Sequence, residues 1–198
     1  VVDVRDPAQV MAACAGMDAI INLSVLRSNP ADAYRVNAIG AYNVMNAALA
    51  HGIRKVVHTG PFQLGESGAL GYSWDTDIVD DVPPRPGINW VYFLSKLCGQ
   101  EMVRIYAETY DLVVPTLTFC QFINPTFNVG KHLVSPLSVS WEDAARAVRC
   151  ALEVASLPSP YEYMHIGTDV PHGVFRTQKA KQLLGWQPRD LLEEWYRR

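Results

Sequence analysis

Short apolar segments alternate with segments of helical character along this chain, and this alternation constrains the fold more than any other feature. Three segments rich in β-branched and aliphatic residues are predicted strands: residues 1–4, 18–24 and 55–59. Two helices are predicted between them, at residues 8–15 and 31–51, and each ends at a glycine. Asp6-Pro7 is a typical start for the first helix. Strands separated by helices and short turns predict a doubly wound parallel sheet of the α/β class.

The second half is less regular. Residues 60–89 are dominated by Gly, Pro, Asp and Ser, which predicts a long loop of functional importance. The elements expected after it are a helix from Tyr92 through Ile105, a strand at 112–119, irregular chain at 122–139, a helix at 141–154, a strand at 161–167 and a helix at 177–184. Pro115 would suit an edge strand, because proline cannot donate to a sheet ladder.

Composition excludes several classes of function. Hydrophobic residues make up 49% of the 198 residues, so a substantial core is expected. The net charge is −3 and no Lys/Arg run occurs, which argues against nucleic acid as a partner. We recognise neither a signal peptide nor an apolar stretch of membrane length. Four widely spaced cysteines favour free thiols in a reducing, cytoplasmic setting, and five histidines without ligand spacing predict no metal site.

Tyr92 and Lys96 are the candidate catalytic pair. On a helix they share one face, one turn apart. A free phenol titrates near ~10, and bringing it to about 7 requires ~4 kcal/mol. One ammonium at about 4 Å supplies roughly that much at an effective dielectric near ~20. The alternative is a core tyrosine beside a solvated lysine, because this spacing is common by chance.

Further segments surround this pair in a characteristic order. They are Asp3-Val4-Arg5-Asp6, Asp18-Ala19-Ile20-Ile21-Asn22-Leu23-Ser24, Asn37-Ala38-Ile39-Gly40, Val56-Val57-His58-Thr59-Gly60, and residues 117–125, 140–144 and 177–188. With Tyr92-Phe93-Leu94-Ser95-Lys96, which matches Y-x-x-S-K, they resemble the extended short-chain dehydrogenase/reductase family, in its NAD-dependent epimerase/dehydratase branch. The likeness covers nearly the whole chain and begins at the third strand of that family's fold.

The resemblance implies a Rossmann-like sheet with a small C-terminal substrate-binding region. Residues 1–120 would form the NAD(P)-binding domain, and residues 121–198 would mainly bind substrate, with 141–154 returning to pack on the sheet. The implied chemistry is hydride transfer to or from NAD or NADP, on a nucleotide sugar or a similar hydroxylated small molecule. A homodimer through the helices of Asn37 and Tyr92 is also implied.

The resemblance also implies roles for single residues. Tyr92 would be the general acid/base, Lys96 would activate it and bind the nicotinamide ribose, Thr59 would orient the substrate and Asn37 would support the active-site helix or a water. The remaining implied contacts are Asp3 and Val4 with the adenine, Leu23, Ser24 and Phe119 with the cofactor, and Gln121 and Gln63 with the substrate.

The sequence departs from the family at several points. The family's glycine-rich phosphate loop is absent from this chain, so we expect further residues before Val1. Gly60-Pro61 stands where the catalytic serine is usual, and Thr59 is the nearest hydroxyl. Thr118 and Gln121 replace an arginine and an asparagine. Residues 125–139 are short for the substrate-binding insert, so we expect residues to be absent there as well.

These departures leave alternatives open. The first is an NAD(P)-dependent epimerase, dehydratase or reductase. The second is a non-catalytic NAD(P)-binding or redox-sensing module that kept the fold and lost the catalytic hydroxyl. The third is a scaffold without cofactor.

Overall fold

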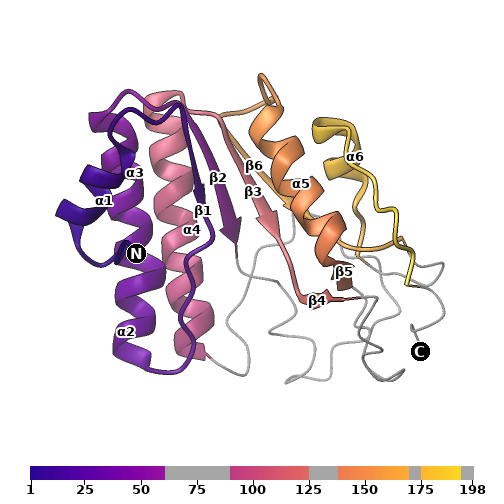
Figure 1. Cartoon of the computed structure of the whole chain (residues 1–198), viewed down its shortest axis with the longest axis horizontal. Coiled ribbons are helices and arrows are strands. Elements are labelled where there is room, and N and C mark those ends of the chain that lie inside the picture. The colour runs from indigo at the N-terminus through magenta and orange to yellow at the C-terminus, as the bar shows by residue number, and fades with distance from the viewer. Residues whose placement is uncertain (61–89, 125–137, 170–174, 193–198) are drawn as a thin grey trace.

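A four-stranded parallel sheet with helices on both faces organises the chain (Figure 1). The computed structural model describes residues 1–60, 90–124, 138–169 and 175–192. The strand order is β1 (Ala19–Asn22), β2 (Lys55–Gly60), β3 (Val114–Thr118) and β6 (Tyr161–His165), and every neighbouring pair is parallel. The predicted α/β class and parallel sheet are confirmed.

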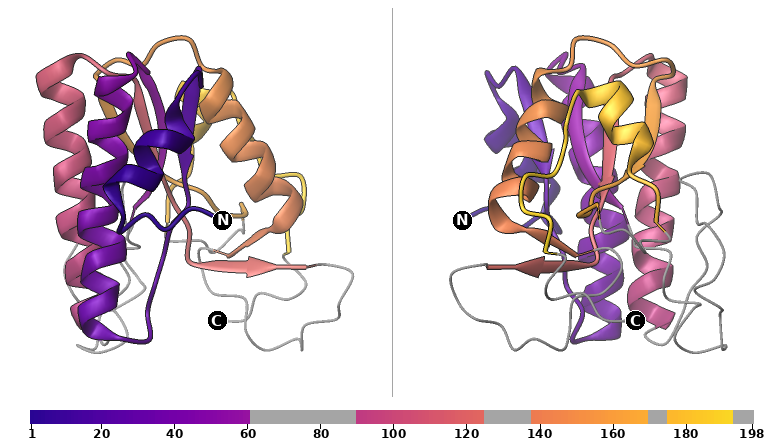
Figure 2. Two further views of the ribbon diagram at one scale, coloured as in Figure 1. Left: turned by 60° about the vertical axis from the view of Figure 1, so that its left-hand side comes forward. Right: turned by 90° about the vertical axis from the view of Figure 1, so that its right-hand side faces the viewer.

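One face of the sheet is covered by the helices of the first half of the chain and by the long helix after residue 89 (Figure 1). They are α1 (Pro7–Cys14), α2 (Pro30–Tyr34), the π-helical η1 (Arg35–Ile39), α3 (Gly40–Ala50) and the long α4 (Trp90–Tyr110). The Asp6 side chain accepts from the first backbone N–H groups of α1, as the Asp-Pro start predicts. Elements α2, η1 and α3 follow one another directly over the helix predicted at 31–51. Figure 2 shows α3 and α4 side by side against the sheet.

The opposite face is covered by α5 (Trp141–Glu153) and α6 (Gln178–Leu184), which confirms both predicted C-terminal helices (Figure 2). Ser140 caps α5 by accepting from the Asp143 N–H at 3.1 Å. One stripe of α5 packs on the sheet because small side chains recur at helical spacing. The buried cluster on this face comprises Val57, Leu117, Val139, Ala144, Ala147, Ala151, Met164, Ile166, Ala180 and Trp186.

The predicted strand at residues 1–4 is wrong. Its backbone groups are taken by side chains instead of a ladder, since Gln9 Oε1 accepts from the Asp3 N–H and the Val4 carbonyl accepts from Asn43. A turn then closes from the Asp6 N–H to the Asp3 carbonyl at 3.0 Å. The segment therefore bends directly into α1 and packs against α3.

Two further expectations need correction. Pro115 lies in β3, which has neighbours on both sides, so it is not in an edge strand. The β2–β3 ladder is interrupted there: it runs from His58↔Thr116 onward, and Lys55 and Val113 form an isolated bridge. The region expected to be irregular also begins and ends in strands, because β4 (Gln121–Ile123) pairs in parallel with β5 (Ser138–Ser140).

Candidate active site

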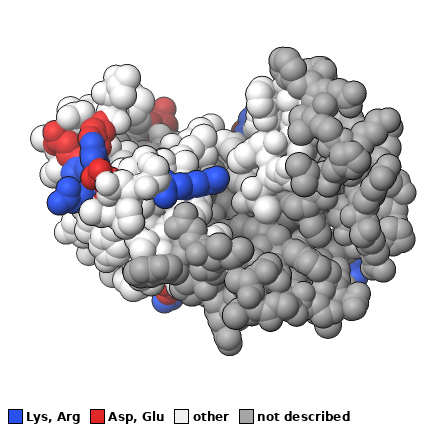
Figure 3. All heavy atoms as spheres, turned by 90° about the horizontal axis from the view of Figure 1, so that it is seen from below, with Lys and Arg blue, Asp and Glu red and all other residues white. Residues whose placement is uncertain are grey.

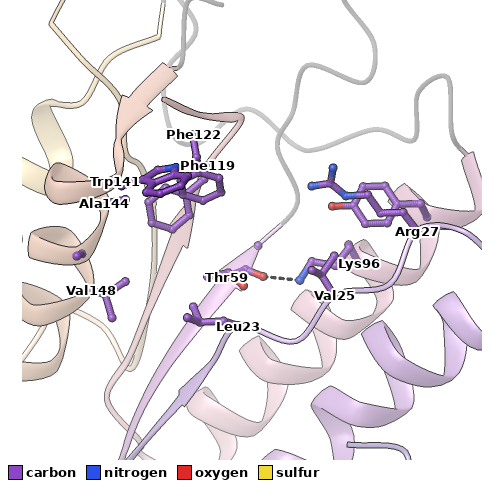
Figure 4. Close-up of a pocket in the computed structure, with 13 residues that line it drawn as sticks. Leu23, Val25, Arg27, Thr59, Lys96, Phe119, Phe122, Trp141, Ala144 and Val148 are labelled. Carbon is purple, nitrogen blue, oxygen red and sulfur yellow. Dashed lines mark hydrogen bonds between the residues drawn. The ribbon is translucent and has the colours of Figure 1, made fainter. Parts of the chain in front are cut away.

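A cavity of about 690 Å³ opens at the carboxyl ends of the central strands. In open parallel sheets this end is where ligands bind. The described residues that line it are Leu23, Val25, Arg27, Thr59, Gly60, Tyr92, Lys96, Phe119, Phe122, Trp141, Ala144, Ala145 and Val148 (Figure 4). Figure 3 views the molecule from this end: a basic side chain extends across the middle of the visible face, and acidic and basic side chains lie together at its left edge.

Lys96, on α4, is buried, and its ammonium group lies against the end of β2. Only 5% of the residue is exposed, and its Nζ donates to the Thr59 carbonyl at 2.8 Å (Figure 4). Burial, with a smaller contribution from the positive charge of Arg27, lowers the pKa of Lys96 to about 8. The alternative of a solvated lysine at this position is therefore wrong.

Tyr92 lines the same cavity from the first turn of α4. The Arg27 guanidinium carbon lies 5.2 Å from the centroid of its ring, within the range of a cation–π contact. The Phe93 ring meets it edge-on at 5.1 Å between centroids. The structure thus brings Tyr92, Lys96 and Arg27 together at one wall of the cavity.

Asn37 holds this wall in place from η1. Its side chain donates to the Leu26 carbonyl and to Ser95 Oγ, both at 2.9 Å, and accepts from the Leu26 N–H. Ser95 in turn donates to the Tyr92 carbonyl at 2.7 Å. The two helices approach so closely that a Cβ at Gly99 would lie 2.1 Å from the Asn37 carbonyl oxygen. Asn37 therefore positions the first turn of α4, and it is not among the cavity-lining residues.

Thr59 lines the cavity together with Lys96. Its carbonyl accepts from Lys96, and its hydroxyl donates to the Asn22 carbonyl at 3.2 Å. A Cβ at the next residue, Gly60, would meet Gln100 Oε1 at 2.3 Å. A serine at Gly60 would therefore require the Gln100 side chain to move.

The predicted cofactor residues fall into two groups. Leu23 and Phe119 line the main cavity. Val4 and Ser24 line a smaller cavity of about 340 Å³ beside β1, which Leu23 also borders. Ser24 also donates to Asn22 Oδ1 at 2.7 Å.

Asp3 and Gln121 are hydrogen-bonded to residues that do not line the main cavity. Asp3 pairs with Arg5 at 2.7 Å, and these hydrogen bonds lower the pKa of Asp3 to about 2. Neither Asp3 nor Gln121 is among the cavity-lining residues, and Gln121 Oε1 accepts from Ser138 at 3.1 Å. Gln63 lies outside the described residues.

Sequence reasoning missed Arg27 and the aromatic wall of Phe122 and Trp141. It also missed His58, which is 2% exposed, with Nδ1 3.3 Å from the Asn22 amide nitrogen. Burial, together with the nearby charge of Lys96, holds the pKa of His58 well below 6.5. The one sequence signal for Arg27 was its position shortly after β1, at the carboxyl edge of the sheet where ligands bind.

In the described parts of the chain, no helix is long and apolar enough to cross a membrane. The same residues contain no group of His, Cys, Asp and Glu side chains suited to a metal ion. The four cysteines are free thiols.

A parallel sheet covered on both faces, with a cavity at its carboxyl edge, is a Rossmann-like α/β architecture. The chain belongs to the NAD dependent epimerase/dehydratase family, whose pattern matches residues 1–138. The family expected from the sequence motifs is confirmed, and with it an NAD-dependent enzyme class.

Named relatives are consistent with this assignment. The chain is 25% identical to a uronate dehydrogenase of Agrobacterium fabrum, covering 98% of this chain and 70% of the relative. It is 26% identical to an L-arabinose 1-dehydrogenase (NAD(P)(+)) of Haloferax volcanii, covering 96% and 81%. A crystal structure of a mutant uronate dehydrogenase from Agrobacterium tumefaciens, complexed with NAD, superposes with a TM-score of 0.77 at 22% identity, covering 95% of this chain and 67% of that one.

Proposed function

We propose that the complete protein is an NAD(P)-dependent dehydrogenase that oxidises a hydroxyl group of a sugar or sugar acid, with Tyr92 as general acid/base. The names of the relatives support a free sugar acid or aldose. A nucleotide sugar stays the alternative substrate class. Phe122 and Trp141 belong to the region 121–198 and line the cavity, and their aromatic side chains would contact the substrate.

The observation that carries this proposal is the buried ammonium of Lys96 one turn from Tyr92. Among the described residues Lys96 donates one hydrogen bond, to the Thr59 carbonyl, which leaves two N–H groups available. A buried cation with spare donors at the edge of a cavity is poised to bind a hydroxyl or a phenolate. The same burial lowers the pKa of Lys96.

The residues present fit a nicotinamide cofactor. The cavity lies at the carboxyl edge of the sheet, its charged described residues are the basic Arg27 and Lys96, and Leu23 and Phe119 offer apolar surface. Lys96 would bind the nicotinamide ribose, and Leu23 and Phe119 would flank the cofactor. Bound NAD(P) would supply the hydride acceptor.

The work of this chain is then proton transfer and orientation. Tyr92 as phenolate accepts the proton of the substrate hydroxyl as the carbon is oxidised, and Lys96 stabilises that phenolate. Thr59 orients the substrate oxygen once its hydroxyl turns from the Asn22 carbonyl. Asn37, through Ser95, keeps the first turn of α4 in register with the cavity.

The test is turnover by the complete protein. We expect NADH or NADPH formation with at least one uronic acid or aldose, and release of the corresponding lactone or acid. Absence of turnover across uronic acids, aldoses and nucleotide sugars, with intact cofactor binding, would contradict the proposal.

One observation favours a second candidate, a non-catalytic NAD(P)-binding module. The Thr59 hydroxyl is engaged with the Asn22 carbonyl, and Gly60 provides no replacement for the usual serine. This candidate predicts cofactor binding and no turnover, so the same assay separates the two.

A homodimer is proposed through the helices that carry Asn37 and Tyr92. Apolar side chains are exposed on η1, α3 and α4, namely Ile39, Tyr42, Leu94, Ile105 and Tyr110. Sedimentation of the complete protein tests this, and a monomer at all concentrations would contradict it.

A further inference from the structure

Arg27 lines the cavity but has no part in the proposed proton transfer. It belongs to the loop that follows β1, where Asn37 bonds both backbone groups of the preceding residue, Leu26. Its guanidinium lies over the Tyr92 ring at 5.2 Å and faces the cavity from that wall (Figure 4). A cation is thus fixed beside the proposed proton acceptor.

Arg27 carries a charge that the described residues do not neutralise. Several other arginines pair with a carboxylate: Arg5, Arg35, Arg54, Arg104, Arg146 and Arg149. In the described structure Arg27 has no such partner, and no Asp or Glu stands among the described residues that line its cavity. The second charged group there is Lys96, whose pKa is lowered in part by Arg27. Two cations facing one cavity create a potential that favours an anionic ligand.

The contact with Tyr92 also decides how Arg27 can bind. The guanidinium carbon lies over the Tyr92 ring, and a cation–π contact does not use the N–H donors of the guanidinium, so these donors can still bind a ligand. They match a carboxylate through two parallel hydrogen bonds. Because the ring already restricts the side chain, less conformational entropy is lost when the anion binds.

We propose that Arg27 binds the carboxylate of the substrate and thereby selects sugar acids over neutral sugars. This inference rests on the proposed dehydrogenase function and names its substrate class. In a cyclic uronic acid the carbons that bear the carboxylate and the anomeric hydroxyl are bonded to the same ring oxygen. A cation stacked on the proton acceptor is therefore well placed for that carboxylate.

The same anion chemistry has a second source, a phosphate group of the cofactor. The cofactor's pyrophosphate is separated from its reacting ring by a ribose, whereas Arg27 lies directly on Tyr92. Position therefore favours the substrate carboxylate. The kinetic constants for cofactor and substrate distinguish the two sources.

The experiment compares matched acidic and neutral sugars, D-glucuronate with D-glucose and D-galacturonate with D-galactose, using the complete protein. Arg27→Gln is expected to lower kcat/KM for the acids by about 100-fold, chiefly through KM, because a charge-assisted bidentate pair is lost. Because Arg27 also contacts Tyr92, kcat/KM for the neutral sugars is expected to fall too, but about tenfold less than for the acids, so the ratio of the two is the readout. KM for NAD(P) is expected to stay within about threefold. Arg27→Lys keeps the charge and loses the planar guanidinium. Its kcat/KM for the acids is expected to lie between those of the wild type and Arg27→Gln.

Arg35→Gln is the matched control, since Arg35 lies on η1, pairs with Asp32 and does not line the cavity. An equal loss for acidic and neutral sugars in Arg27→Gln would overturn the inference, and a rise confined to the KM of the cofactor would reassign Arg27 to a phosphate. Calorimetric titration of D-glucuronate into the protein saturated with NAD(P) separates this inference from the dehydrogenase proposal. If D-glucuronate binds to the wild type and not to Arg27→Gln, and neither protein shows turnover, the anion site is supported and the dehydrogenase proposal is rejected. Turnover of neutral sugars with no D-glucuronate binding would retain the dehydrogenase and reject the anion site.

Discussion

The two faces of the sheet differ in what they bury near the carboxyl ends of the strands. On the α5 face the strands present Val57, Leu117 and Met164, all fully buried and apolar. On the α4 face β2 and β3 begin with Val56 and Val114 and continue with polar side chains, namely His58, Thr116 and Thr118. Helix α4 adds Ser95, Lys96 and Gln100 to this polar layer, and all three are buried.

This contrast separates stability from chemistry. Burying apolar surface stabilises the fold, whereas burying a polar group costs free energy unless it is hydrogen-bonded. In the described structure, His58 Nε2 and Gln100 Oε1 lie in the polar layer without a hydrogen-bond partner. We infer that the α5 face stabilises the fold and that the polar layer is maintained for function.

Substitution of Lys96 by Met should have the largest opposite effects on stability and on turnover. Turnover is expected to fall about 1,000-fold, because the ammonium that supports acid–base catalysis is removed. The free energy of unfolding is expected to rise, by up to about 3 kcal/mol, because burial lowers the pKa of Lys96 from 10.5 to about 8. Steady-state rates and urea unfolding measure the two effects.

The same lysine gives a pH signature. Between pH 8 and 10.5 the unfolded chain holds more protons on Lys96 than the folded chain, so the free energy of unfolding should increase with pH in this window. Lys96→Met should lack that increase. A variant that loses stability as well as activity would contradict the separation of roles.

Substitution of Trp186 by Ala tests the apolar face. Trp186 is 1% exposed, and its indole N–H donates to the Asp143 carbonyl at 3.0 Å. The expected cost is about 3–5 kcal/mol of unfolding free energy, with kcat per folded molecule unchanged. Trp186→Phe keeps most of the volume and should cost less, so it remains informative if the alanine variant does not fold.

Substitution of Asn37 by Ala affects the link between the polar layer and the cavity. It removes three hydrogen bonds, to Leu26 and Ser95, and should cost about 1–3 kcal/mol. Turnover is expected to fall more than cofactor affinity, because the first turn of α4 carries Tyr92. Asn46→Ala is a suitable control, since Asn46 accepts from Tyr106 at 2.8 Å and lies outside the cavity. Equal kinetics in both variants would argue against a positioning role for Asn37.

The smallest expected effect concerns His58. Burial keeps its pKa well below 6.5, so the unfolded chain binds more protons than the folded chain as the pH falls below that value. The free energy of unfolding should then decrease by at most about 1.4 kcal/mol per pH unit. His58→Gln should flatten this acid slope, and an unchanged slope would show that other groups cause it.

Local signals predicted most of the fold. Asp6-Pro7 begins α1 as expected, and Gly185 follows the last residue of α6. The failures involve long-range pairing: Pro115 is tolerated in a central strand because the ladder has a gap beside it, and β4 and β5 pair across residues outside the described parts.

The candidate site was predicted in part. Helical spacing and the family motif identified Tyr92 and Lys96 as cavity residues. Arg27 could not be found in the same way, because its role depends on a ring far along the chain. Gly60 shows the same limit, since the approach of the Gln100, Thr116 and Tyr163 side chains to this residue could not be predicted from the sequence.

The most direct test of the central claim is Tyr92→Phe in the complete protein, compared with Tyr110→Phe on the exposed end of the same helix. We predict that Tyr92→Phe retains NAD(P) binding and its unfolding midpoint and loses turnover by about 1,000-fold or more, whereas Tyr110→Phe keeps wild-type turnover. Turnover in Tyr92→Phe equal to that of Tyr110→Phe would contradict the proposed acid–base role.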